Sequence, residues 1–406
     1  MSRQQTAELL RKIAPELEGE LYQSWTEVMP RATPQEIDLV VFPLLHIGHI
    51  PPLLSNELKH GNYNFIIMES GLTSTDSKTD FLTSRFAHEI RALSPFKRGA
   101  LADILAPVLS GEAYTEKKSP DFSFKVDLFH SSLVYSRPMI FAEKRSAEAN
   151  EKLDTLFQRS YWNLRPTALR LFLDGDVESS VHIKCEGDFQ FGCYNITREH
   201  EIRERLQQLP QDLQRRYTML WQNDSVVGVF PVGAGHTSLV RDLRNDFNYN
   251  PYVKVVEHPA SLGRLWMNSY DGQMQQIIRA GLDNNWNWNY TEDLSLALFP
   301  EIASDFYKQK GLILHSIFSE ILGNYIHQNF RIAPTEQYFL SDVLAKRLTA
   351  DDILRFSGKG KGLSFDTGVH QVWNLFRSFA KERDIYVPAR HDEASRLVQE
   401  YKESIS

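Results

Sequence analysis

One strand–loop–helix pattern occurs twice in this chain and constrains its fold more than any other feature. The first copy reads VVFPLLHIGHIPPLLSNELKHG, residues 40–61, and the second reads VVGVFPVGAGHTSLVRDL, residues 226–243. In each copy a valine-rich apolar run leads to a Gly-His pair and then to a helical segment. Runs of this kind are typical of strands buried in a parallel sheet, so we expect an α/β fold.

The segments that follow each copy complete a βαβ unit. Pro51 and Pro52 open the helix of the first copy and Gly61 follows its end, which are the usual boundary residues of a helix. The run NYNFIIMES, residues 62–70, then predicts a second strand. The second copy is followed by YVKVVEHP, residues 252–259, which predicts another strand. We therefore interpret each copy as the start of its own Rossmann-like domain.

The predicted architecture has two such domains facing a cleft, followed by a mostly helical section. Residues 1–218 would form the first domain and residues 219–406 the second, with helices from about Thr291 onward. Between the copies we expect a strand at residues 168–176 and a hairpin at residues 179–196.

The amino-acid composition limits the classes of protein to which this chain can belong. The chain has 406 residues, of which 42% are hydrophobic and 24% are charged, as in ordinary folded proteins. Its net charge of -7 does not favour an extended nucleic-acid surface. The only cysteines are Cys185 and Cys193, so no disulfide framework or four-cysteine zinc site is expected. The sequence has no recognisable secretory signal and no apolar run that could span a membrane, so we expect a cytoplasmic protein.

The Gly-His pairs mark the expected site. In a βα unit a ligand binds beyond the carboxyl end of the strand, where the helix presents free N–H groups. Glycine allows the backbone to approach closely, and a histidine there can move a proton near neutral pH. His49 in the first copy and Gly235, His236 and Thr237 in the second are therefore candidate site residues. Thr237 also fits a simple helix cap.

The first copy, VVFPLLHIGHIPPLLSNELKHG, resembles the first strand–loop–helix of GT-B glycosyltransferases, especially the sugar-nucleotide-dependent enzymes of family 1. The resemblance implies two Rossmann-like domains, the first binding the acceptor and the second the nucleotide. It also implies that His49 is the general base on the acceptor hydroxyl. His46, in the same loop, is a candidate substrate-binding residue. The diphosphate would bind at Gly235, His236 and Thr237.

Two further segments resemble motifs of another GT-B group, the bacterial sialyltransferases. LFLDGDVESS occupies the place of an acidic motif, and YVKVVEHPAS that of a His-Pro motif. By this resemblance Asp174 is catalytic and His258 binds the nucleotide. Asp174 also fits an ordinary residue of a glycine turn.

Two other segments suit charged or flat ligands. SGKGKG, residues 357–362, could hold a diphosphate through its backbone N–H groups and Lys359, or could be a solvated loop. NNWNWNY, residues 284–290, places Trp286 and Trp288 on one face of a strand. These two indoles could stack on a sugar or fill a core.

Together these features predict a glycosyltransferase that moves a sugar from a nucleotide-activated donor to an acceptor hydroxyl, with no cofactor and no bound metal. Two alternatives stay open. The chain could be a non-catalytic interaction or defence-associated protein, in which both copies are only core. It could also be a metal-dependent enzyme that uses scattered His, Asp and Glu residues, although His46 and His49 alone are too few ligands for a metal.

Overall fold

The computed structural model describes residues 37–45, 50–69, 153, 155–216, 226–245, 253–259, 262–282, 290 and 292–405, with scattered positions between 124 and 142. The chain divides into two compact units. The first comprises residues 1–150 and 198–261, and the second comprises residues 151–197 and 262–406. This division differs from the predicted boundary after residue 218, because residues 151–197 pack with the helices near the C-terminus.

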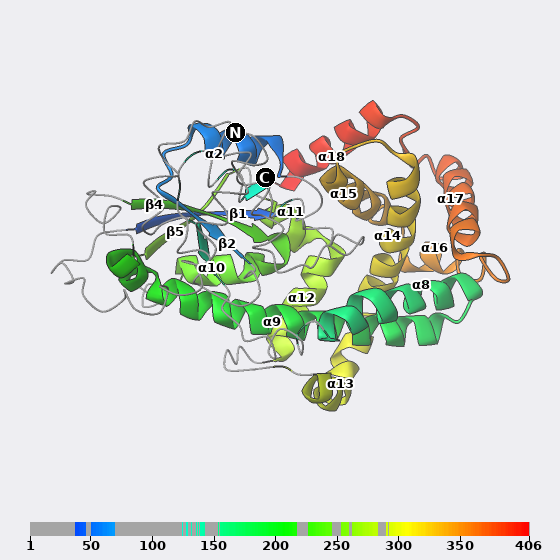
Figure 1. Cartoon of the computed structure of the whole chain (residues 1–406). Helices are drawn as coiled ribbons and strands as arrows, with labels where there is room; N and C mark the ends of the chain where they lie inside the picture. Colours follow the sequence, from blue (N-terminus) through cyan, green and yellow to red (C-terminus); the bar gives the residue numbers. More distant parts are fainter. Residues whose placement is uncertain are drawn as a thin grey trace, which may run out of the picture. The chain divides into compact units, whose positions relative to one another are not determined.

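A parallel five-stranded sheet forms the described core of the first unit (Figure 1). The strands are β1 (Ile37–Leu44), β2 (Phe65–Met68), β3 (Met139–Phe141), β4 (Val226–Gly233) and β5 (Val253–Glu257). Their order across the sheet is β3-β2-β4-β1-β5. Each recorded strand pair is parallel, so the carboxyl ends of all five strands lie at one edge.

The two copies of the sequence pattern lie side by side in this sheet. β1 and β4 pair along their whole length, from Ile37 with Val226 to Leu44 with Gly233. Helix α2 (Pro52–His60) leads from β1 toward β2, and α10 (Thr237–Asn245) leads from β4 toward β5. This differs from the expectation that each copy begins a separate domain, because each strand is the other's hydrogen-bonding partner. A second Rossmann-like sheet and a cleft between two sheets stay predictions.

The described part of the second unit consists of helices (Figure 1). They are the π-helix η1 (Gln158–Leu164), α8 (Arg165–Asp174), α9 (Val177–Arg216, of which residues up to 197 belong here), α11 (Gly263–Asn268), α12 (Tyr270–Gly281), α13 (Glu292–Tyr307), α14 (Lys310–Asn329), α15 (Pro334–Ala345), α16 (Ala350–Leu354), α17 (Phe365–Glu382) and α18 (His391–Ile405). The helices after Thr291 agree with the predicted helical section.

The predictions of a strand at residues 168–176 and a hairpin at residues 179–196 are wrong, since these segments belong mostly to the helices α8 and α9. The apolar side chains buried in α8 share one face: Ala168, Leu169, Phe172 and Leu173. Those along α9 recur every fourth residue: Val181, Cys185, Phe189 and Cys193. That spacing is the period of a helix and not of a strand. Both cysteines are free thiols.

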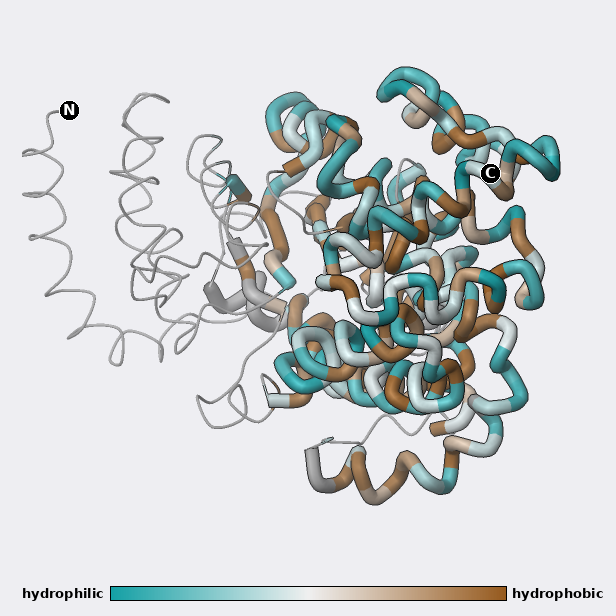
Figure 2. The backbone as a smooth tube through the Cα atoms, turned by 90° about the vertical axis from the view of Figure 1, so that its right-hand side faces the viewer, coloured by the Kyte–Doolittle hydropathy of each residue, from teal (hydrophilic) through white to brown (hydrophobic). Residues whose placement is uncertain are grey.

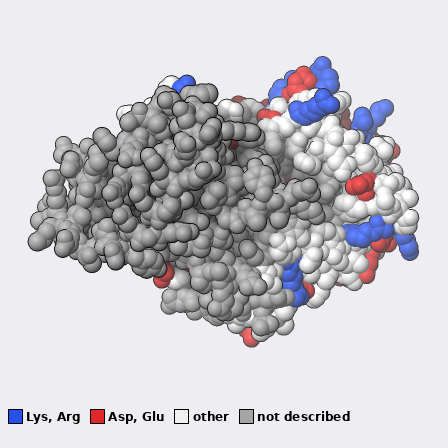
Figure 3. Space-filling view, in the orientation of Figure 1, with Lys and Arg blue, Asp and Glu red and all other residues white. Residues whose placement is uncertain are grey.

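Helix α14 organises the core of the second unit. It packs against α8, α12, α15, α16 and α17. Hydrophobic and hydrophilic residues alternate along the helices of this unit (Figure 2), as expected for helices that bury one face. On the face shown in Figure 3, charges of both signs are interspersed over the described residues. Among the helices that the structure describes, none has the length and apolar character needed to span a bilayer.

Candidate functional site

The carboxyl edge of the sheet carries a group of buried charged side chains. Glu69 directly follows β2, and β4 ends at Gly233, from which the short helix η3 (Ala234–His236) leads into α10. Arg198 and Glu199 come from the part of α9 that belongs to the first unit. We call Glu69, Arg198, Glu199 and His236 the carboxylate–histidine site.

His236 lies between two carboxylates. Its Nδ1 atom is 3.1 Å from Oε1 of Glu199, and its Nε2 atom is 3.1 Å from Oε1 of Glu69. The three side chains are almost fully enclosed, with exposed fractions of 2% for His236, 0% for Glu199 and 5% for Glu69. Both ring nitrogens are therefore engaged, and the ring is held in one orientation.

Glu69 contacts Arg198 and the backbone of Gly233 in addition to His236. Its Oε1 atom accepts a hydrogen bond from the Arg198 guanidinium, and its Oε2 atom accepts one from the backbone N–H of Gly233. A Cβ atom at position 233 would lie 3.0 Å from Oε2 of Glu69. Glycine at this position is what allows the end of β4 to approach the carboxylate so closely.

Each contact of His236 with a carboxylate requires a proton or a cation between the ring nitrogen and the carboxylate oxygen. A neutral imidazole has one N–H group and can donate to only one of two carboxylates, while an ionised carboxylate only accepts. With Glu199 at Nδ1 and Glu69 at Nε2, the second contact needs one more proton, on the ring or on a carboxyl group, or a cation between the nitrogen and the oxygen.

Four residues predicted to bind the nucleotide lie at this same edge. Gly235 and His236 belong to η3, and Thr237 begins α10, where its hydroxyl donates to the carbonyl of Ala234 at 2.6 Å. His258 follows β5, and its backbone N–H donates to the carbonyl of Val41 at 2.8 Å.

The side chain of His258 is held by the ring of Phe42. The two rings stack with centroids 4.3 Å apart, and the Nε2 atom lies 3.9 Å from a carboxylate oxygen of Glu57. Burial lowers the pKa of His258, and Glu57 opposes this shift only in part. His258 therefore contacts Phe42 and approaches Glu57 at the end of β5.

Asp174 and Lys359 belong to the second unit, where they lie in neighbouring segments. Asp174 ends α8 and accepts two hydrogen bonds from Arg170, both at 2.9 Å. Lys359 is exposed in the SGKGKG segment, residues 357–362, which packs on the end of α8. The N–H groups of Gly358 and Gly360 donate to the carbonyls of Phe172 and Leu173, at 3.0 and 2.9 Å. These N–H groups cap a helix and so are not offered to a diphosphate.

The contact between this segment and α8 gives a stability prediction. Gly175 has φ +96°, and a Cβ atom there would lie 3.3 Å from the Cα atom of Gly358. Gly175→Ala should therefore lower the free energy of unfolding by about 1–2 kcal/mol for the left-handed backbone, plus the cost of this contact. Gly362→Ala is the matched control, because Gly362 also has positive φ but nothing within 4 Å of the added atom. Urea unfolding should rank Gly175→Ala as the less stable variant, and equal losses would contradict the packing argument.

The remaining predicted site residues, His46, His49, Trp286 and Trp288, lie outside the described residues. Within the described part of the chain, no cluster of three or more His, Cys, Asp or Glu side chains suited to a metal ion is found.

Sequence reasoning missed Glu69, Arg198 and Glu199. Glu69 had a usable signal, since it is an acidic residue directly after the buried run FIIM of β2. Arg198 and Glu199 had no such sequence signal. They lie within a long charged helix, and only the tertiary fold brings them to His236.

Comparisons of this chain with protein-family models, with curated proteins and with solved structures find no match.

Proposed function

We propose that this chain is a metal-dependent hydrolase in which Glu69 and His236 hold a divalent cation at the carboxyl edge of the sheet. The observation that carries the proposal is the 3.1 Å approach of His236 Nε2 to Glu69 Oε1, two atoms that need a proton or a cation between them. A metal ion can take the place of that proton.

The spacing of the two atoms suits a shared metal ion. Nitrogen and oxygen ligands lie about 2.0–2.2 Å from Zn²⁺, so two ligands of one ion are roughly 3.0–3.4 Å apart for bond angles between octahedral and tetrahedral. The separation of 3.1 Å between Nε2 and Oε1 falls in this range. Only small side-chain movements would be needed for both atoms to bind one ion.

Glu199 has the position of a supporting carboxylate. Histidines that bind metals usually donate their other ring N–H to a carboxylate or carbonyl, which fixes the tautomer and strengthens the ligand. Glu199 is fully buried and meets the Nδ1 atom of His236, so the Nε2 atom is left to face Glu69. These contacts support the order Glu199–His236–metal–Glu69 for the proposed site.

A metal site of this kind requires a third protein ligand besides His236 and Glu69. Leu44, the last residue of β1, pairs with Gly233 next to the site. His46 and His49 follow Leu44 in the sequence, and catalytic zinc sites commonly have three protein ligands with one position open for water. Replacing each histidine with alanine and measuring zinc affinity would identify the ligand.

Hydrolysis is the chemistry that this set of groups would support. A bound divalent ion can lower the pKa of its water to about 7, which supplies hydroxide as the nucleophile at neutral pH. The Arg198 guanidinium contacts Glu69 and would lie close to the ion, where it could stabilise the oxyanion that forms on an ester or amide. Incubation of the zinc-loaded and manganese-loaded protein with p-nitrophenyl acetate and p-nitrophenyl phosphate is the direct assay. Turnover that is equal in wild type and in His236→Gln would refute the proposal.

Glu199→Gln should weaken the binding of zinc by about 10–100-fold, the usual effect of removing a carboxylate that supports a ligating histidine. The matched control is Glu204→Gln on the same helix, since Glu204 is exposed and pairs with His200 at 3.2 Å. Competition against a chromogenic chelator measures both affinities. Equal affinity in wild type and in Glu199→Gln would mean that Glu199 does not support a ligand.

Sugar transfer from a nucleotide-activated donor is the second candidate function. It is favoured by one observation, that Gly235, His236, Thr237 and His258 gather at one sheet edge. The carboxylates of Glu69 and Glu199 beside His236 count against a bound diphosphate, because like charges repel. A thermal-shift screen with UDP, GDP, CDP and CMP separates the candidates. A nucleotide that binds at 100 times its dissociation constant should add about 2.7 kcal/mol of stability, and a metal-dependent hydrolase should respond to zinc or manganese instead.

A further inference from the structure

His315 lies on α14 and has both ring nitrogens against backbone carbonyl oxygens. Its Nδ1 atom is 2.7 Å from the carbonyl oxygen of Gly311, one turn earlier on the same helix. Its Nε2 atom is 2.9 Å from the carbonyl oxygen of Leu348, which is 33 residues away in sequence. Leu348 belongs to the turn of residues 346–349 between α15 and α16. The ring therefore joins α14 to this turn.

These two contacts determine how many protons the His315 ring needs. A neutral imidazole has one N–H group, and a carbonyl oxygen only accepts hydrogen bonds. With one proton, the ring would donate to one carbonyl and direct the lone pair of its other nitrogen at the second carbonyl oxygen. Unlike the carboxylates beside His236, a backbone carbonyl does not take up the missing proton near neutral pH. Only the doubly protonated ring makes both hydrogen bonds.

Tyr270 of α12 covers one face of the His315 ring. The two rings stack with centroids 5.1 Å apart and an angle of 26° between their planes. Burial raises the pKa of Tyr270, so its phenol stays uncharged near neutral pH. The face of a neutral aromatic ring attracts a cation, so this contact also favours the charged imidazole. His315 itself is half-buried, which leaves part of the ring in contact with solvent.

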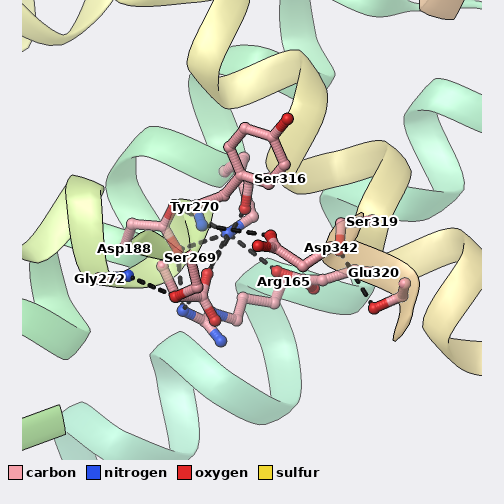
Figure 4. A network of polar contacts seen from close by, with 12 residues as sticks. Arg165, Asp188, Ser269, Tyr270, Gly272, Ser316, Ser319, Glu320 and Asp342 are labelled. Atoms are coloured by element: carbon pink, nitrogen blue, oxygen red, sulfur yellow. Dashed lines mark hydrogen bonds and ion pairs between the residues drawn. The ribbon is translucent and has the colours of Figure 1, made fainter. Parts of the chain in front are cut away.

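The charged groups on the elements around the ring are paired with groups of opposite charge. Asp342 of α15 lies beside Tyr270, whose backbone N–H donates to it at 3.3 Å (Figure 4), and Lys346 pairs with Asp342 at 3.0 Å. The other pairs are Asp271 on α12 with Arg165, Glu320 and Lys310 on α14 with Lys184 and Glu178, and Asp352 on α16 with Arg383. Since these charges offset one another, the two carbonyl contacts are what distinguish the folded ring from a solvated one.

The turn of residues 346–349 connects several helices of the second unit. Lys346 contacts the carbonyl oxygen of Asn268, at the end of α11, and the hydroxyl of Tyr401 on α18. Thr349 caps α16, where its hydroxyl accepts a hydrogen bond from the N–H of Asp352 at 3.2 Å. The contact between His315 and Leu348 therefore holds the turn at which α11, α16 and α18 meet α15.

We propose that His315 is a pH-sensitive lock that holds the turn of residues 346–349 against α14. In mild acid the doubly protonated ring donates to both carbonyl groups. As the pH rises and the ring loses one proton, one of these hydrogen bonds is lost. Because the folded chain favours the charged ring, this contribution to stability is fully present in mild acid and is lost as the pH rises. The proposal does not depend on the hydrolase, because all of these residues belong to the second unit.

NMR spectroscopy of the full chain with isotope-labelled histidine tests the proposal directly, because the nitrogen shifts separate protonated from unprotonated ring nitrogens. His315→Gln identifies the signals of His315 by their disappearance. The matched control is His327, which is exposed on the same helix and contacts Gln337 through one nitrogen at 3.0 Å. His315 should hold its second proton at least about tenfold more tightly than His327, the effect of one hydrogen bond to a charged group.

A second variant and a second readout keep the test decisive. Tyr270→Phe keeps the ring that stacks on His315, so it should shift the same signals and identify them if His315→Gln proves poorly folded by circular dichroism. In urea unfolding, His315→Gln should lose more stability relative to wild type at about pH 6 than at about pH 8, whereas His327→Gln should follow wild type at both. The proposal is overturned if His315 loses its second proton at the same pH as His327, or if folded His315→Gln loses equal stability at both pH values.

Discussion

Lys184→Met should lower the free energy of unfolding by about 3–5 kcal/mol, because removing one partner of a buried ion pair leaves the opposite charges unpaired. Lys184 is fully buried and three carboxylates lie within 4 Å of its amine: those of Asp188, Asp271 and Glu320. Methionine fills a similar volume, so the loss reports the charge and not a cavity. Urea unfolding followed by circular dichroism measures it.

Lys310→Met is the matched control for this experiment. Lys310 pairs with Glu178, but both side chains are exposed, so its removal should cost no more than about 1 kcal/mol. If Lys184→Met also lowers the free energy of unfolding by less than about 1 kcal/mol, the ion pairs of Lys184 with Asp188, Asp271 and Glu320 do not stabilise the second unit as predicted.

His236→Gln should weaken zinc binding by more than about 100-fold, since loss of a ligand must exceed the 10–100-fold effect of losing a supporting group. Glutamine keeps a polar side chain of similar length but cannot present an imidazole nitrogen to Glu69 while contacting Glu199. Calorimetric titration measures the affinity. His258→Gln is the control, because His258 lies at the same sheet edge, where its ring stacks on Phe42 and approaches Glu57. Equal weakening in both variants would point to a general disturbance of that edge.

Much of the first unit could be predicted from local patterns. The strands β1, β2, β4 and β5 are short apolar runs bounded by glycine, proline or polar residues, and α2 begins at Pro52 and ends before Gly61 as predicted. Which strands pair could not be predicted in this way. The placement of β4 between β1 and β2 joins segments almost 190 residues apart, as in the pairing of Ile37 with Val226, and no local pattern records it.

Local patterns predict the wrong secondary structure in the second unit where a segment fits both the period of a strand and the period of a helix. In α8 the run ALRLFLD has so many apolar residues that it fits a buried strand as well as a helix, and burial of Leu169, Phe172 and Leu173 decides for the helix. In α9 the alternation in DFQFGCYNI is compatible with a strand, but Cys185, Phe189 and Cys193 lie on one helical face. In both α8 and α9 the tertiary packing of the apolar side chains therefore outweighed the local propensity for a strand.

The candidate site could be predicted only in part. The Gly-His signal located His236 at the end of a strand, and the rule for parallel sheets located the edge. The groups that give His236 its chemistry are Glu69 and Glu199, which lie 167 and 37 residues away in sequence. Since charged side chains are common at helix and strand ends, their sequence positions alone did not distinguish them from surface residues.

Calorimetric titration of the metal-free chain with zinc and with manganese, at neutral pH and in mildly acidic buffer, tests the central claim most directly. A metal ion that replaces the proton between His236 and Glu69 must release protons as it binds, so its affinity should fall in acid. The account predicts one ion bound per chain, with an affinity that falls in acid and is lost in His236→Gln. It is contradicted if neither ion binds to wild type, or if His236→Gln binds the ion as tightly as wild type does.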